Sequence, residues 1–222
     1  MNIFEFAYLL IPVVIAAALF AFIRFKYPNG TIRPLGYSFI LGMVAAFAAL
    51  AVLHVAGLLG LDQPKSLKRT AFLSFVVFGG AQEFFKFLIL RFYALPLKIF
   101  RGSADGMVYA VAISMGMSVV TMISYIKTPL FHQFDFYYAM LATLGIANTF
   151  SAIIMGFFVG MGKARNNRFV DSLTGLAAAA FLHGLYMFCF FTHEYLLAML
   201  AGIITLGIVA FFVVLVLRNL EE

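Results

Sequence analysis

The sequence predicts an all-α fold, a polytopic transmembrane helical bundle of about seven spans, because three features of its composition point to the membrane. Hydrophobic residues make up 64% of the 222 residues and charged residues only 11%, and the mean hydropathy is +1.05. These values lie far outside the range of a soluble globular domain. Residues 1–222 are therefore expected to form a single integral membrane domain, with the lipid bilayer as its surroundings.

Seven apolar runs are long enough to cross a bilayer core, which takes about 20 apolar residues per helix. The expected spans are residues 3–23, 36–60, 71–95, 104–126, 136–162, 168–192 and 195–217. The first is expected to be a retained helix, because "MNIFE" has neither the basic region nor the cleavage site of a secretory signal. Turn-forming segments punctuate the loops: "YPNG", "RPLG", "LDQPKS", "RGSADG" and "KARNNR".

Glycines four residues apart, Gly156 and Gly160, lie in the fifth run. Such spacing lets helix backbones approach closely in lipid. Ordinary packing within the monomer is the favoured interpretation, and a dimer face is the alternative.

The basic residues predict an orientation rather than a nucleic-acid partner. The net charge is +6, but Lys and Arg are spread over short loops next to helix ends instead of forming one patch. With seven spans and an external N-terminus, the inside segments hold ten Lys and Arg and the outside segments hold four. This asymmetry favours an N-terminus outside the cell and a cytoplasmic C-terminus.

Two charged residues, Glu83 and Lys86, interrupt the third apolar run in "GGAQEFFKFLIL". A charge near the bilayer centre costs about 2.5–3.5 kcal/mol on insertion scales, so such residues usually face a partner or a cavity. Gln82, Glu83 and Lys86 occupy neighbouring positions of one helical stripe. The stripe is expected to line a polar cavity, and the alternative is a Glu83–Lys86 pair that only offsets its own insertion cost.

Other runs supply polar residues at compatible depths, so the cavity is expected within residues 71–192. The candidates are Thr121 and Ser124 in the fourth run, Asn148, Thr149 and Ser151 in the fifth, and His183 in the sixth. Intramembrane Ser and Thr often bond their own helix backbone, and His183 has the alternative of a satisfied interhelical contact. Asp105 opens the fourth run, where helix capping alone would account for a carboxylate.

A glutamate and a histidine in one membrane cavity can deprotonate a water molecule, which predicts hydrolysis within the bilayer. In this interpretation Glu83 is the base, and His183 polarises the water or the scissile carbonyl. No cofactor is expected. A divalent metal stays open as an alternative, although a catalytic zinc normally takes three protein ligands and the chain has no HExxH helix.

Five segments then carry a resemblance. They are "QEFFK" from Gln82, "DGMVY" from Asp105, "MGMSVVTM" from Met115, "ANTFSAIIMGFFVG" from Ala147 and "FLHGLYM" from Phe181. In this order they resemble the PrsW family of bacterial intramembrane proteases, within the superfamily of the CAAX prenyl proteases. The resemblance implies that the chain lies in the bacterial cytoplasmic membrane and that its substrate is a membrane-anchored protein.

The resemblance also assigns site positions. Glu83, Lys86, Asp105, Tyr109 and His183 match the family pattern. Gln82 stands where the family has its first glutamate, Thr121 and Met122 replace a Glu-Asn pair, Asn148 lies approximately at the first histidine, and Met187 replaces an acidic residue. An amide is not a base, so a pseudoprotease that binds transmembrane segments is an alternative to a protease. A small membrane carrier that uses the path of Glu83, Lys86 and His183 is a further alternative.

Overall fold

The structure, a computed structural model, describes residues 3–26, 32–132 and 137–218. Within these ranges, seven helical stretches are long and apolar enough to cross a membrane. They are α1 (Ile3–Lys26), α2 (Arg33–Leu58), a composite third span, α5 (Ser103–Lys127), α7 (Tyr137–Ala164), α8 (Arg168–Thr192) and α9 (Tyr195–Arg218). A short helix, α6 (Pro129–His132), precedes α7. The predicted all-α bundle of seven spans is confirmed.

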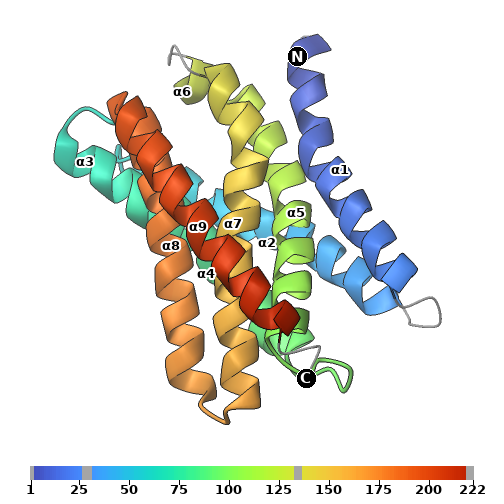
Figure 1. The fold of residues 1–222 in the computed structure, drawn as a ribbon. Helices are drawn as coiled ribbons and strands as arrows, with labels where there is room; N and C mark the ends of the chain where they lie inside the picture. Colours follow the sequence, from blue (N-terminus) through green and yellow to red (C-terminus); the bar gives the residue numbers. More distant parts are fainter. Residues whose placement is uncertain (1–2, 27–31, 133–136, 219–222) are drawn as a thin grey trace.

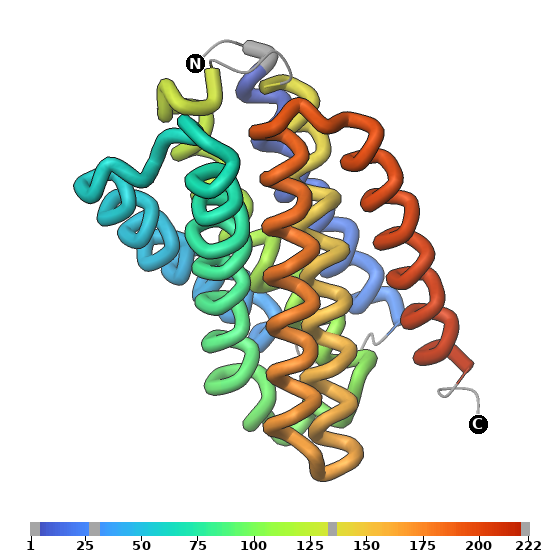
Figure 2. The backbone as a smooth tube through the Cα atoms, turned by 90° about the vertical axis from the view of Figure 1, so that its left-hand side faces the viewer, coloured from blue at the N-terminus to red at the C-terminus, as the bar shows by residue number. Residues whose placement is uncertain are grey.

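The bundle is built around α5, the most buried of the seven spans. It packs chiefly against α7 on one side and α2 on the other (Figure 1). Figure 2 shows α7 and α8 as an antiparallel pair joined at the bottom, with α9 on the outside. The N-terminal and C-terminal ends lie at opposite ends of the bundle, as an odd number of spans requires.

The third span changes its helical type along its length. It runs through α3 (Leu67–Phe72), the π-helical stretch η1 (Leu73–Gly80), α4 (Ala81–Ile89) and the π-helical stretch η2 (Leu90–Ala94). Ser66 caps its start, since the Ser66 hydroxyl accepts from the Arg69 backbone N–H at 3.4 Å. Short π-helical segments occur frequently at functional sites, and here they flank the helix that carries Glu83 and Lys86.

Two spans begin several residues earlier than expected. "RPLG" forms the first turn of α2 rather than a loop, with Pro34 near the start of the helix, where its missing N–H costs no intrahelical bond. The third span begins at Leu67, because the Ser66 cap extends the helix beyond the apolar run. The turn "YPNG" includes residues 27–30, which lie outside the described residues, as does the expected start of the fifth span at residue 136.

Glycines allow α5 and α7 to touch backbone to backbone. A Cβ atom added to Gly106 would lie 2.1 Å from the carbonyl oxygen of Gly156, and one added to Gly160 would lie 2.4 Å from that of Gly102. Gly156 and Gly160 therefore pack within the monomer, which confirms the favoured interpretation of their spacing.

Gly156→Ala should destabilise the bundle, because its new Cβ would lie 2.3 Å from the carbonyl oxygen of Gly106. Overpacking of this kind costs about 1–3 kcal/mol, so the thermal midpoint of the detergent-solubilised protein, followed by circular dichroism, should fall by several degrees. Gly202→Ala is the matched control, since no atom of the described residues lies within 4 Å of its added Cβ. Equal midpoints for the two variants would contradict the close α5–α7 contact.

Candidate active site

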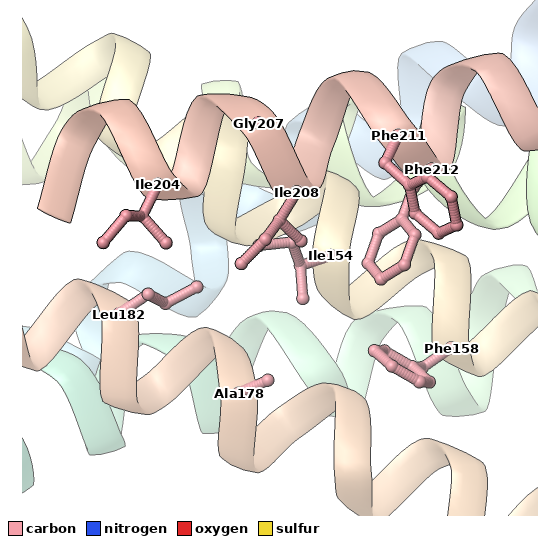
Figure 3. Close-up of a pocket in the computed structure, with 9 residues that line it drawn as sticks. All are labelled: Ile154, Phe158, Ala178, Leu182, Ile204, Gly207, Ile208, Phe211 and Phe212. Carbon is pink, nitrogen blue, oxygen red and sulfur yellow. The ribbon is translucent and has the colours of Figure 1, made fainter.

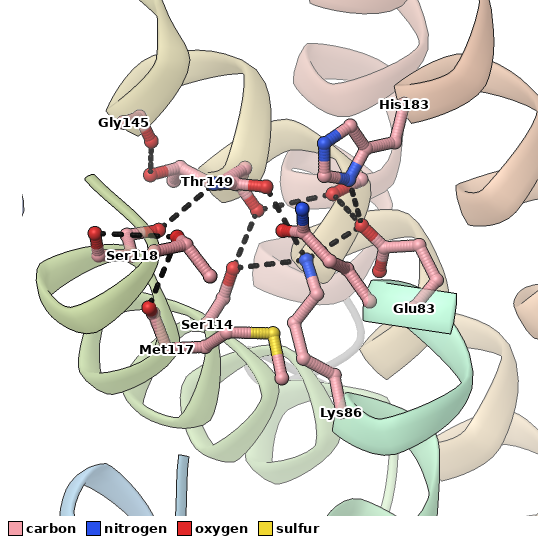
Figure 4. A network of polar contacts seen from close by, with 12 residues as sticks. Glu83, Lys86, Ser114, Met117, Ser118, Gly145, Thr149 and His183 are labelled. Atoms are coloured by element: carbon pink, nitrogen blue, oxygen red, sulfur yellow. Dashed lines mark hydrogen bonds and ion pairs between the residues drawn. The ribbon is translucent and has the colours of Figure 1, made fainter. Parts of the chain in front are cut away.

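A cluster of buried polar side chains joins four spans (Figure 4). Glu83 and Lys86 come from α4, Ser114 from α5, Asn148 from α7 and His183 from α8, and each of the five is at most 3% exposed. Glu83 and Lys86 are three residues apart, which places them on the same face of the helix. The predicted convergence of polar residues from the third, fifth and sixth spans therefore takes the form of a packed, hydrogen-bonded cluster.

One oxygen of Glu83 receives three contacts. Its Oε1 lies 2.5 Å from Lys86 Nζ, 2.8 Å from His183 Nδ1 and 2.9 Å from Ser151 Oγ. In the His183 tautomer that carries its proton on Nδ1, the ring donates to Glu83 and keeps Nε2 as an acceptor. A carboxylate thus holds the imidazole in place through one ring nitrogen and leaves the other nitrogen for chemistry.

A second layer of bonds holds Lys86 in position. Its Nζ lies 3.3 Å from Ser114 Oγ and 3.4 Å from Asn148 Oδ1. Ser114 Oγ donates to the Asn148 backbone carbonyl at 2.9 Å, and Asn148 Nδ2 donates to Ser118 Oγ at 2.9 Å. These contacts fix α4 against α5 and α7, so the ammonium group has little freedom to leave the carboxylate.

Three buried atoms of this region have no hydrogen-bond partner among the described residues: Glu83 Oε2, His183 Nε2 and Gln82 Oε1. Buried polar atoms without partners are rare and call for an explanation, such as a catalytic role or a bound water. A carboxylate oxygen and an imidazole nitrogen are the two groups that can accept a proton from water. Glu83 Oε2 and His183 Nε2 are of this kind, whereas Gln82 Oε1 is an amide oxygen and is not a base.

Gln82 faces a different neighbour from Glu83. Its Nε2 donates to the Tyr125 hydroxyl, and both side chains are buried. The amide thus connects α4 to α5 near a group of aromatic rings, where Tyr125 packs against Phe78 and Phe131.

Three candidate residues lie outside the network of hydrogen bonds around Glu83. The Thr121 hydroxyl donates to the Met117 carbonyl of its own helix at 3.1 Å. Asp105, in the first turn of α5, accepts through Oδ2 from the backbone N–H of Arg101, which precedes the helix, at 2.6 Å. The Tyr109 ring stacks on Phe100 with 5.9 Å between centroids.

Two serines of the cluster were not among the candidates drawn from the sequence. Ser114 and Ser118 are four residues apart on α5 and fully buried, so both face the interior. In the sequence, only their four-residue spacing within "AISMGMSVV" sets them apart. That spacing does not predict a contact with another helix, because a buried serine can equally bond its own backbone.

An apolar groove lies beside the cluster but does not share its residues. It has a volume of about 580 Å³ and lies between α9 and the α7–α8 pair, lined only by apolar side chains and Gly207 (Figure 3). Leu182, next to His183 in sequence, is one of the residues that line it. A smaller pocket of about 350 Å³ at one end of α2 and α5 includes His54, Asp62, Ser124 and Thr128.

The donor set does not match a common catalytic zinc site. Among the residues that the structure describes, no three His, Cys, Asp or Glu side chains come together to hold a metal ion. Glu83 Oε2 and His183 Nε2 are two ligand-type atoms, whereas such a site normally takes three protein ligands.

Comparison with known proteins identifies a family that the chain matches. Residues 31–217 match the family described as PrsW family intramembrane metalloprotease. "Protease PrsW" of Bacillus subtilis (strain 168) is 26% identical over 176 residues, which are 78% of this chain and 77% of the relative. "Protease PrsW" of Oceanobacillus iheyensis is 29% identical over 108 residues, 48% of this chain and 49% of the relative. No solved structure gives a significant match. The family match covers most of the chain, and the chain therefore belongs to the PrsW family.

Proposed function

We propose that the chain is an intramembrane protease that hydrolyses a peptide bond of a membrane-anchored protein. One observation carries this proposal: Glu83 holds His183 at 2.8 Å inside the membrane-spanning region, and each side chain keeps one atom that can accept a proton and has no partner among the described residues. The names of the two relatives, both proteases, support the same reaction class.

The contacts favour His183 as the base, which exchanges the roles suggested by the sequence. Glu83 Oε1 already accepts three donors, so its charge is largely engaged in orienting the imidazole. In the proposed step, His183 Nε2 takes a proton from water while the water oxygen bonds to the scissile carbonyl carbon. The C–N bond then breaks, and the protonated Nε2 returns its proton to the leaving amine.

The environment of the proposed substrate follows from the burial of the site. Glu83 is 0% exposed, so a substrate segment and a water molecule reach it only when the neighbouring helices separate. A membrane-anchored protein is the class of substrate that meets these helices at the right depth. We place the chain in the bacterial cytoplasmic membrane with its N-terminus outside, which is supported by the ten basic residues of the inside segments against four outside.

A second candidate function, binding of a transmembrane segment without hydrolysis, is favoured by one specific feature. The position beside Glu83 is an amide, Gln82, whose Nε2 bonds Tyr125, and an amide cannot serve as a base. The two functions differ in whether the chain generates new protein N-termini.

His183→Ala should abolish cleavage, because loss of a general base typically lowers a rate about 10²–10⁴-fold. The measurement compares newly generated protein N-termini in membranes from cells that carry the native chain, His183→Ala or Glu83→Gln. Fragments present with the native chain should be absent with both variants. His54→Ala is the control for loss of a histidine outside the cluster, and it should retain the fragments. Fragments that persist in His183→Ala would overturn the assignment.

Gln82→Glu separates the second candidate from the first. Under the proposed function the native chain already produces fragments, so this substitution is not required for cleavage. Fragments that appear only with Gln82→Glu would instead identify a chain that binds its partner without cutting it, and would show that the missing carboxylate at position 82 had silenced hydrolysis.

A further inference from the structure

The charge of the buried cluster is already balanced without a metal. Across the described residues, Glu5 and Glu83 are the buried carboxylates and Lys86 is the buried lysine. Glu5 lies in the first turn of α1 and pairs with Tyr137 at 3.4 Å, away from the cluster contacts. Glu83 and Lys86 lie 2.5 Å apart, so their negative and positive charges cancel. A neutral His183 adds no further charge.

A divalent cation would upset this balance. Bound at Glu83 Oε2 and His183 Nε2, it would add two positive charges beside the Lys86 ammonium, with no second buried carboxylate among the cluster residues to compensate. Uncompensated charge is expensive in a low-dielectric interior. The description of the family as metalloproteases and the charge of this cluster therefore disagree.

The neutral groups nearby are also committed to other partners. Asn148 Oδ1 faces Lys86 Nζ at 3.4 Å while its Nδ2 donates to Ser118. Gln82 directs its Nε2 to Tyr125. A third metal ligand would have to come from Asn148, which already contacts the Lys86 ammonium, or from Gln82, which already bonds Tyr125 of α5.

We propose that the Lys86 ammonium is the resident cation of this site, and that the cluster takes no catalytic divalent metal. Lys86 acts as a positioning residue: it balances the carboxylate that holds His183, a role that a metal ion would otherwise fill. This assignment goes beyond the proposed function. Its tests use no substrate, so their outcome does not depend on whether the chain cleaves a protein.

The first test measures metal content. Purified native chain, Glu83→Gln and His183→Ala are incubated with Zn²⁺ or Co²⁺, desalted and assayed by elemental mass spectrometry, and the visible absorption of Co²⁺ reports its coordination. We expect no metal that depends on the cluster: the native chain and both variants should carry equal, small amounts. One metal per native chain that is lost in both variants would overturn the proposal. Metal retained equally by all three proteins lies elsewhere and agrees with it.

The second test asks whether Lys86 is needed as the counter-charge. Lys86→Met should lower the thermal midpoint of the detergent-solubilised protein, because it leaves the Glu83 carboxylate buried and unbalanced. Adding Glu83→Gln to Lys86→Met removes that charge and should recover part of the loss, whereas a purely steric role for the lysine predicts no recovery. An unchanged midpoint in Lys86→Met, or a double variant as unstable as the single one, would contradict the proposal.

Discussion

The convergence of three donors on one oxygen of Glu83 is the interaction on which the rest of the structure depends. A carboxylate buried among membrane spans is costly unless it is paired and hydrogen-bonded, and here the donors come from three helices: Lys86 of α4, Ser151 of α7 and His183 of α8. Because these bonds are short, they tolerate little sliding of one helix along another. The buried charge therefore fixes the register of the bundle as well as its chemistry.

Close helix packing brings these donors within reach. Gly79 lies one turn before Glu83, and a Cβ there would lie 2.5 Å from the Ala180 carbonyl oxygen, one turn before His183. This contact between η1 and α8 lets Glu83 reach the imidazole directly. The π-helical geometry of η1 widens the turn that precedes Glu83, so it changes which face of α4 meets α8.

The sequence predicted the spans and the charged centre better than it predicted the supporting residues. Apolar runs are long and uniform, and Glu83, Lys86 and His183 stand out against them because charged or titratable groups are rare in lipid. Hydroxyl residues lack such contrast: Thr121 bonds its own helix, whereas Ser114 and Ser118 bond across helices. That choice depends on the neighbouring helix, which residue spacing alone does not specify.

The buried ion pair and the unpartnered atoms of this cluster are not features that add much to the stability of the bundle. Leaving a buried polar atom unsatisfied costs about 1–3 kcal/mol, and well-packed apolar residues of similar volume are often at least as stable as a buried ion pair. Glu83 and Lys86 nevertheless occupy the centre of the bundle, with Glu83 Oε2 and His183 Nε2 unpartnered among the described residues. A group that is buried, oriented through one atom and unpartnered at the other can accept a hydrogen bond from a ligand, and in the proposed function that ligand is water beside a scissile carbonyl.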